Sequence, residues 1–239
     1  MDAIFYVLRT GIQWKALPKA ICSGSTAHKW FKIWRQAGVF RNLWKKGLVE
    51  YDQRIGLDWE WQAMDGAMTK APLAGESTGP NPTDRAKSGT KRSLLTEGHG
   101  IPIAVAVDGA NRTDMKMVKA TLDNIVVDRP TPTPEKPQNM CMDKGYDYSE
   151  VRQAVDEYGY TAHIKRRGQE IQEKKDIPGY RARRWVVERT HSWMNRFRRL
   201  LIRWEKDVEN YVAMLHLACA YITFHAIRSH QLANSTHVV

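Results

Sequence analysis

The sequence predicts an α/β fold, in which a core of strands and helices is preceded by a small helical segment. Two observations carry this prediction. Apolar residues recur at helical spacing through the first sixty positions, whereas the middle of the chain contains short apolar runs rich in β-branched residues. Helical patterns separate and follow these runs, and strands interleaved with helices form an α/β core.

The N-terminal segment is expected to be helical. Residues 1–10 carry an apolar stripe that Gly11 ends, and a second helix opens at Ser25 or Thr26, both good N-cap residues, and runs to Gly38. The charged face of this second helix contains His28, Lys32 and Arg35. Two interpretations stay open: a solvated face above a tryptophan-rich core, or the second helix of a helix-turn-helix unit that meets DNA.

The remaining elements follow in order along the chain. The apolar runs predict strands at residues 62–64, 101–107, 139–142 and 161–165. The helical patterns predict helices at residues 114–126, 149–158, 181–204 and 208–227. Two stretches rich in turn-forming residues are expected to be surface loops, namely 71–93 and 128–139.

The charge balance argues for a polyanionic partner. The 239 residues include 37 Lys and Arg against 26 Asp and Glu, a formal net charge of +11, and the excess lies in residues 1–62 and 148–239. The sequence contains no run of 18 apolar residues, so no membrane-spanning helix is expected. The N-terminus lacks the pattern of a signal peptide. The three cysteines do not cluster, which speaks against a disulfide framework or a zinc site and agrees with a cytoplasmic location.

Three carboxylates lie at positions where a catalytic or ligand-binding acid is expected. Asp65 is expected to follow a strand that ends at Met64 and to enter a turn at Gly66, and Asp143 also follows an apolar strand. Such strand ends meet at the rim of a sheet, where open α/β folds bind ligands. The third carboxylate, Glu188, lies in the most basic predicted helix. Taken alone, each has an ordinary interpretation as a turn former or a salt-bridged surface residue.

The surroundings of Glu188 favour a functional interpretation. Arg184, His191 and Asn195 share its helix face, and Arg181 extends that face by one turn, while tryptophans supply an apolar face that can dock on the sheet. Oxygen ligands without clustered cysteine or histidine point to Mg²⁺ or Mn²⁺. Three carboxylates around two such ions are the arrangement that phosphoryl transfer uses.

Several strings resemble one family, in the expected order along the chain. They are AMDGAMTKAP, GPNPTDRAKSGTKRSLLTEGHGIPIAVAVDGANRTD, MDKGYD and RRWVVERTHSWMNRFRRL. They resemble the core of bacterial insertion-sequence transposases with an Asp-Asp-Glu triad, in the group of the fifth-named insertion element within a wider superfamily named after the fourth. The N-terminal strings DAIFYVLRTGIQWKALP and STAHKWFKIWRQAGVF resemble the helical DNA-binding segment of that group.

The resemblance implies a ribonuclease-H-like core, a mixed sheet flanked by helices, in which Asp65, Asp143 and Glu188 are the catalytic triad and hold two Mg²⁺ or Mn²⁺ ions. It implies hydrolysis at the ends of an insertion element and joining of the 3′ ends to target DNA. The implied partners are double-stranded DNA, comprising terminal inverted repeats and target, and further copies of the chain in a dimer or larger synaptic complex.

The resemblance also implies a division of the chain and a set of DNA contacts. We expect a helical DNA-binding segment at 1–58 that is incomplete at its N-terminus, a catalytic domain at 59–230 and a tail at 231–239. The residues expected to contact DNA are Arg181, Arg184, His191, Asn195, Arg198, Arg199, Lys87, Lys91, Arg92, Lys144, Tyr146, Lys29, Lys32 and Arg35.

Two other functions compete with transposition. One is a catalytically silent or N-terminally truncated DNA-binding regulator derived from such an enzyme, although all three acids are present. The other is a ribonuclease-H-like nuclease that cuts without strand transfer, which should lack the N-terminal helical unit.

Overall fold

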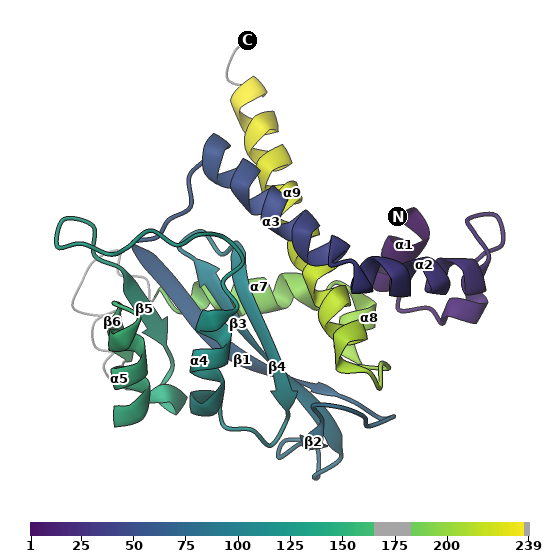
Figure 1. Cartoon of the computed structure of the whole chain (residues 1–239), viewed down its shortest axis with the longest axis horizontal. Coiled ribbons are helices and arrows are strands. Elements are labelled where there is room, and N and C mark those ends of the chain that lie inside the picture. Colours follow the sequence, from purple (N-terminus) through teal and green to yellow (C-terminus); the bar gives the residue numbers. More distant parts are fainter. Residues whose placement is uncertain (165–182, 237–239) are drawn as a thin grey trace.

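The computed structural model describes residues 1–164 and 183–236, and its centre is a mixed sheet (Figure 1). The strands are β1 (Trp61–Lys70), β2 (Gly79–Pro80), β3 (Ser88–Glu97), β4 (Pro102–Gly109), β5 (Asn139–Met142) and β6 (Thr161–Ile164). β1 pairs antiparallel with β3, which pairs antiparallel with β4, while β1, β5 and β6 run parallel. Three antiparallel strands followed by two parallel ones confirm the predicted ribonuclease-H-like core.

Helices cover both faces of the sheet, as two consecutive residues of β3 show. The hydroxyl of Ser93 accepts a hydrogen bond from Thr121 of α4 (Val118–Asp123), whereas Arg92 donates to α7 (Trp185–Met194) on the other face. Adjacent strand residues point to opposite faces, so α4 and α7 lie on opposite sides. β3 is therefore buried along almost its whole length.

The remaining helical elements surround this core. They are η2 (Asp114–Met117) before α4, η3 (Lys144–Tyr146) after β5, α5 (Ser149–Glu157), α8 (Arg198–Leu201) and the long α9 (Val208–Thr236). α9 is long and apolar enough to cross a membrane by length and composition alone, but 61% of its most apolar window is buried inside the protein, as in the core helix of a globular domain.

The N-terminal segment is helical, as predicted, and shares the core of the sheet domain. It contains α1 (Asp2–Thr10), η1 (Trp14–Ala16), α2 (Gly24–Gln36) and α3 (Val39–Arg54). Gly11 ends α1 in a left-handed conformation, with φ of +72°, as its position predicts. α3 packs along α9, and the buried Trp44 donates its indole N–H to the carbonyl of Pro102 at the start of β4. One hydrophobic cluster therefore spans both parts of the chain.

Several predicted boundaries were wrong. β1 does not end at Met64 but continues to Lys70, because antiparallel pairing with β3 carries it through Gly66, which pairs with Ser93. The end of the predicted loop 71–93 is the first half of β3.

The C-terminal helices also differ from the prediction. The helix expected over 181–204 is interrupted between Met194 and Arg198, where α7 ends and the short α8 begins. α9 continues to Thr236 and takes in most of the predicted tail. The helix expected over 114–126 is a 3₁₀ turn followed by the short α4.

Candidate active site

Asp65 lies within β1, two residues beyond Ala63, where the pairing of β1 with β5 ends, and is paired on its other side with β3. Its backbone pairs with Leu94 of β3, and burial is the main cause that raises the pKa of its carboxyl to about 6. The charges of Asp143 and Glu188 add to this rise in the pKa, while the Gly66 amide and Arg184 oppose it. The three carboxylates are therefore close enough to interact electrostatically.

Asp143 reaches this site because β5 is the parallel neighbour of β1. It follows the last residue of β5, and its Oδ1 accepts a hydrogen bond of 2.8 Å from the amide of Gly145. This contact caps η3 and holds the carboxyl at the end of the strand. The turn therefore fixes the second acid beside the first.

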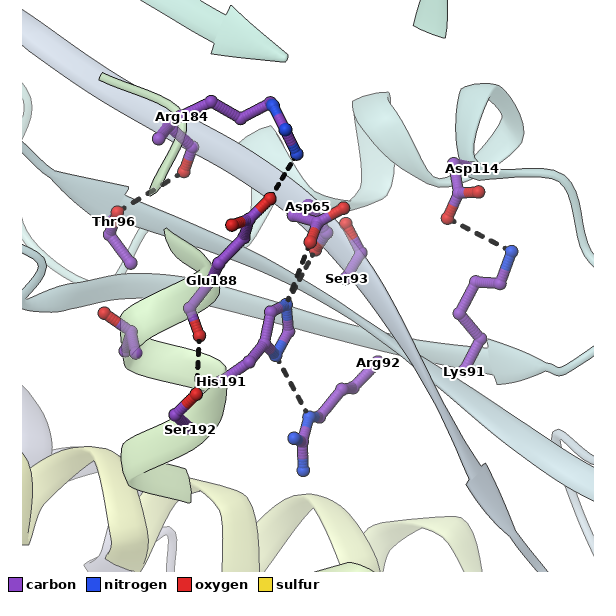
Figure 2. A network of polar contacts seen from close by, with 12 residues as sticks. Asp65, Lys91, Arg92, Ser93, Thr96, Asp114, Arg184, Glu188, His191 and Ser192 are labelled. Carbon is purple, nitrogen blue, oxygen red and sulfur yellow. Dashed lines mark hydrogen bonds and ion pairs between the residues drawn. The ribbon is translucent and has the colours of Figure 1, made fainter. Parts of the chain in front are cut away.

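Glu188 comes from α7, which lies across β1 and β3. Its carboxylate is ion-paired with Arg184, one helical turn earlier, and is about half exposed. In Figure 2 its side chain projects from α7 toward Asp65, and Arg184 reaches over it. The acid from the helix thus faces the acid of the strand across a space open to solvent.

The three acids fit a divalent ion of the magnesium type. Their donors are carboxylate oxygens, the ligands that Mg²⁺ and Mn²⁺ prefer. Burial first, and then repulsion from Asp143 and Glu188, raise the pKa of Asp65, and a bound cation would relieve that repulsion. Among the described residues, no three Asp, Glu, His or Cys side chains stand close enough together to form a ligand cluster.

A second layer of side chains fixes the Asp65 backbone. Arg92 Nε donates to Nδ1 of His191 at 3.3 Å, and Nη2 of Arg92 donates to Oδ1 of Asn195 at 2.6 Å. Because Nδ1 of His191 accepts, Nε2 carries the proton and donates to the carbonyl oxygen of Asp65 at 3.3 Å (Figure 2). Burial first, and then Arg92, lower the pKa of His191 to about 3, so the ring is neutral.

Five residues predicted to contact DNA are buried inside the protein. They are Lys91, Arg92, Tyr146, His191 and Arg199. Lys91 is not on a loop but in β3, where its Nζ lies 3.1 Å from Oδ1 of Asp114. Arg199 Nε donates to Glu205 at 2.7 Å. The charge count along the chain does not reveal which basic side chains are buried and neutralised within the fold.

Other predicted DNA contacts lie at the surface. The exposed residues among those predicted to contact DNA are Lys29, Lys32, Lys87, Lys144, Asn195 and Arg198. Arg184 is half-buried beside Glu188, and Arg35 is half-buried in contact with Asp207 and Asn210. Arg181 lies outside the described residues.

Asp114 is a fourth carboxylate beside the site that sequence reasoning missed. A Cβ added to Gly66 would lie 2.1 Å from Oδ1 of Asp114, so the acid packs directly against the strand that carries Asp65. Tyr146 lies among these acids, and burial followed by the charges of Asp114, Asp65 and Asp143 raises its pKa well above the usual value. The string GANRTD contained Asp114, but an acid in a polar turn is usually solvated.

Comparison with known proteins covers both parts of the chain. The sequence model of the family "Transposase DDE domain" matches residues 61–223, and that of "Putative transposase of IS4/5 family" matches residues 1–44. The chain is 37% identical over 154 residues to "Putative transposase for insertion sequence element IS402" of Burkholderia cepacia, covering 63% of this chain and 70% of the relative. It is 30% identical over 84 residues to an uncharacterized 16.2 kDa protein of the same element and organism, covering 34% of this chain and 57% of that relative.

Solved structures give a more distant likeness. The catalytic core domain of BIV integrase aligns with a TM-score of 0.36 and 12% identity, over 72% of this chain and 99% of that one. The Mos1 mariner paired end complex with Mn aligns with a TM-score of 0.30 and 11% identity, over 84% and 77% of the two chains.

Proposed function

Since the chain belongs to the transposase DDE domain family, we propose that it hydrolyses phosphodiester bonds at the ends of an insertion element and joins the freed 3′ hydroxyls to target DNA. The observation that carries the proposal is the placement of three carboxylates around one strand: Asp65 lies in β1, Asp143 follows the parallel neighbour β5, and Glu188 projects from α7, which packs on β1. Three coupled carboxylates at the edge of a sheet suit the binding of divalent ions and a phosphate.

Each acid has a distinct place in the proposed reaction. Asp65 and Asp143 would hold two Mg²⁺ or Mn²⁺ ions, and Glu188 would complete the ligands of one. When bound, the ions supply an activated water or 3′ hydroxyl and a counter-charge for the leaving oxygen. Arg184 orients the Glu188 carboxylate through their ion pair. His191 takes no proton, because its Nδ1 accepts from Arg92, and instead anchors the Asp65 backbone.

The proposed partner is double-stranded DNA, bound through the exposed basic residues. Lys144 lies directly after Asp143, and Arg198 follows the helix of Glu188, so both can contact phosphates close to the reacting bond. Lys87 and the exposed lysines of α2 extend this positive surface. We place the reaction in the cytoplasm, at the nucleoid. We propose that the chain acts as a dimer or larger assembly that pairs two element ends.

A cleavage assay tests the proposal. The purified full chain is incubated with Mn²⁺ and labelled linear DNA that carries the inverted repeats flanking its gene. We expect nicking at the repeat end that Asp143→Ala abolishes, while Asp156→Ala, which removes an exposed acid of α5 away from the triad, leaves it unchanged. Binding of the repeat without any nicking by the wild type would instead identify a silent DNA-binding regulator.

A further inference from the structure

A second polar network lies on the face of the sheet opposite α7, behind the strand that carries Asp65. Adjacent residues of β3 point to opposite faces, so Lys91 and Ser93 project toward the face that α4 covers, whereas Arg92 projects toward α7. Figure 2 shows Lys91 reaching Asp114, whose Oδ1 lies 3.1 Å from Nζ of the lysine. The proposed reaction leaves this acid and this lysine without a role.

Asp114 packs against β1 because Gly66 has no side chain. A Cβ at Gly66 would lie 2.1 Å from Oδ1 of Asp114 and 3.5 Å from Cδ of Lys91. Both side chains therefore occupy the space behind the residue that follows Asp65. Lys91 is only 6% exposed, so water screens its ion pair with Asp114 less than it screens a pair at the surface.

Tyr146 reaches the same place from the turn that follows Asp143. Oδ1 of Asp143 accepts a hydrogen bond from the Gly145 amide at 2.8 Å, and the Tyr146 amide donates to the Asp143 carbonyl at 3.1 Å. η3, which contains Tyr146, packs against η2, which contains Asp114. Because Tyr146 is 1% exposed, any movement of its ring also moves the turn that directs the Asp143 carboxylate.

Two buried polar atoms of this network are complementary. Among the described residues, no group is placed for a hydrogen bond with the hydroxyl of Tyr146, although Ser93 lies close enough to influence it. Oδ1 of Asp114 has its ion-pair contact with Lys91 but likewise no hydrogen bond. Burial first, and then the charge of Asp114 ahead of the other acids, raise the pKa of Tyr146, so its hydroxyl keeps its proton. A buried donor thus lies beside a buried acceptor, and such groups are rarely left unpaired.

We propose that the Tyr146 hydroxyl donates a hydrogen bond to the Asp114 carboxylate, and that Tyr146 thereby acts as a positioning residue for Asp143. The proposal rests on the proposed function and adds a residue to it. Lys91 holds Asp114, and Asp114 holds the tyrosine whose turn directs the second acid of the triad. Partners of this kind set the affinity of a metal site by orienting its ligands. The acids are then supported from both faces of the sheet.

Manganese binding tests this role without requiring cleavage. Free Mn²⁺ is measured by electron paramagnetic resonance while the full chain is titrated without DNA. We expect Tyr146→Phe, which keeps the ring and removes only the hydroxyl, to weaken Mn²⁺ binding by about 10- to 100-fold, as loss of a ligand's partner does in other metal sites. Asp114→Ala should weaken binding to the same extent. Adding Tyr146→Phe to Asp114→Ala should change the affinity by less than about twofold, because the hydrogen bond is already absent.

A matched tyrosine separates positioning from stability. Tyr160 is also buried, and its hydroxyl donates to Oε1 of Gln62 at 2.6 Å. It precedes β6, whereas Asp143 follows the parallel strand β5, so the two residues lie at opposite ends of the parallel strands. Tyr160→Phe should lower the melting temperature through the lost hydrogen bond and keep the Mn²⁺ affinity within about twofold of the wild type.

The possible outcomes are distinct. Unchanged Mn²⁺ affinity in Tyr146→Phe overturns the role, as do losses that multiply in the double variant or an equal loss in Tyr160→Phe. If circular dichroism shows that Tyr146→Phe does not fold, Asp114→Ala alone must show the expected loss, and unchanged affinity there overturns the proposal. A wild type that binds Mn²⁺ and nicks the repeat keeps its proposed function whatever the variants do, whereas one that binds no Mn²⁺ loses that function as well.

Discussion

Arg92 and His191 are 99 positions apart in the sequence, yet Nε of the arginine donates to Nδ1 of the histidine at 3.3 Å. This bond joins β3 to α7 and makes the histidine a neutral donor toward the Asp65 carbonyl. The distance between the strand acid and the helix acid is therefore set by a buried arginine that never needs to touch DNA.

Replacing Arg92 tests this connection. We expect Arg92→Gln to lower single-turnover nicking by about 10- to 100-fold, as loss of a positioning partner does in other metal sites, and Arg92→Lys to recover part of it. The unfolding free energy in urea should also fall by about 2–4 kcal/mol, because a buried network loses a member. Lys116→Gln, at an exposed lysine, should change neither quantity. Full activity in Arg92→Gln would contradict the positioning role.

Asp65→Asn should separate stability from function. The buried carboxylate is repelled by Asp143 and Glu188, so the neutral amide should raise the unfolding free energy by about 1–3 kcal/mol at pH 7.5 without metal. The same substitution should abolish nicking. Added Mn²⁺ should raise the melting temperature of the wild type and leave that of the variant unchanged, as thermal unfolding would show. A metal-induced shift in the variant would argue against Asp65 as a ligand.

Gly66→Ala should disturb the site through Asp114. The added methyl would lie 2.1 Å from Oδ1 of Asp114, so either the Asp114 side chain or β1 must shift. We expect a loss of about 1–3 kcal/mol in unfolding free energy, the cost typical of overpacking. In an Asp114→Ala background the same substitution should cost much less, because the clashing atom is gone. Additive effects in this double-mutant cycle would show that the two residues are not in contact.

His216 should make stability depend on pH. Burial and then Arg41 lower the pKa of this histidine to about 4 in the folded chain, and its ring packs against Trp44. Between pH 6.5 and 4 the unfolded chain therefore binds a proton that the folded chain does not, so stability is retained above pH 6.5 and lost as the pH falls. From pH 7 to 5 this group should remove about 1–2 kcal/mol.

His216→Phe isolates that contribution. The variant should show a smaller loss in urea unfolding between pH 7 and 5 than the wild type does, since a phenyl ring keeps the contact with Trp44 but takes no proton. An identical pH dependence in the two proteins would assign the effect to other groups, such as His191.

The α/β architecture could be predicted because hydrophobic periodicity reports burial directly. β4, β5 and β6 begin and end close to the predicted strands. β3 escaped prediction because its first half is SGTKRS, a polar string whose Lys91 and Arg92 are nevertheless buried. Their partners, Asp114 and His191, come from distant elements. No local pattern reports such tertiary pairing.

The three acids could be singled out from the sequence, but the elements that carry them could not be bounded. The sequence placed Asp65 at a strand end, whereas pairing of Gly66 with Ser93 puts it inside β1. The helix of Glu188 was expected to continue to Trp204, but it ends at Met194, and the short α8 begins at Arg198. Such boundaries depend on packing against α9 and α1, which act from far along the chain.

The packing of α3 on α9 bears on how new DNA specificity could arise. Trp44 and its neighbours complete the interior of the sheet domain, so the N-terminal helices are not an interchangeable module. A chimera that exchanges residues 1–58 for those of another element would replace part of a shared interior and leave α9 mismatched. Under the proposed function, recognition of new element ends should therefore evolve by substitutions on the solvent-facing surface of α2, where Lys29 and Lys32 can change without disturbing the core.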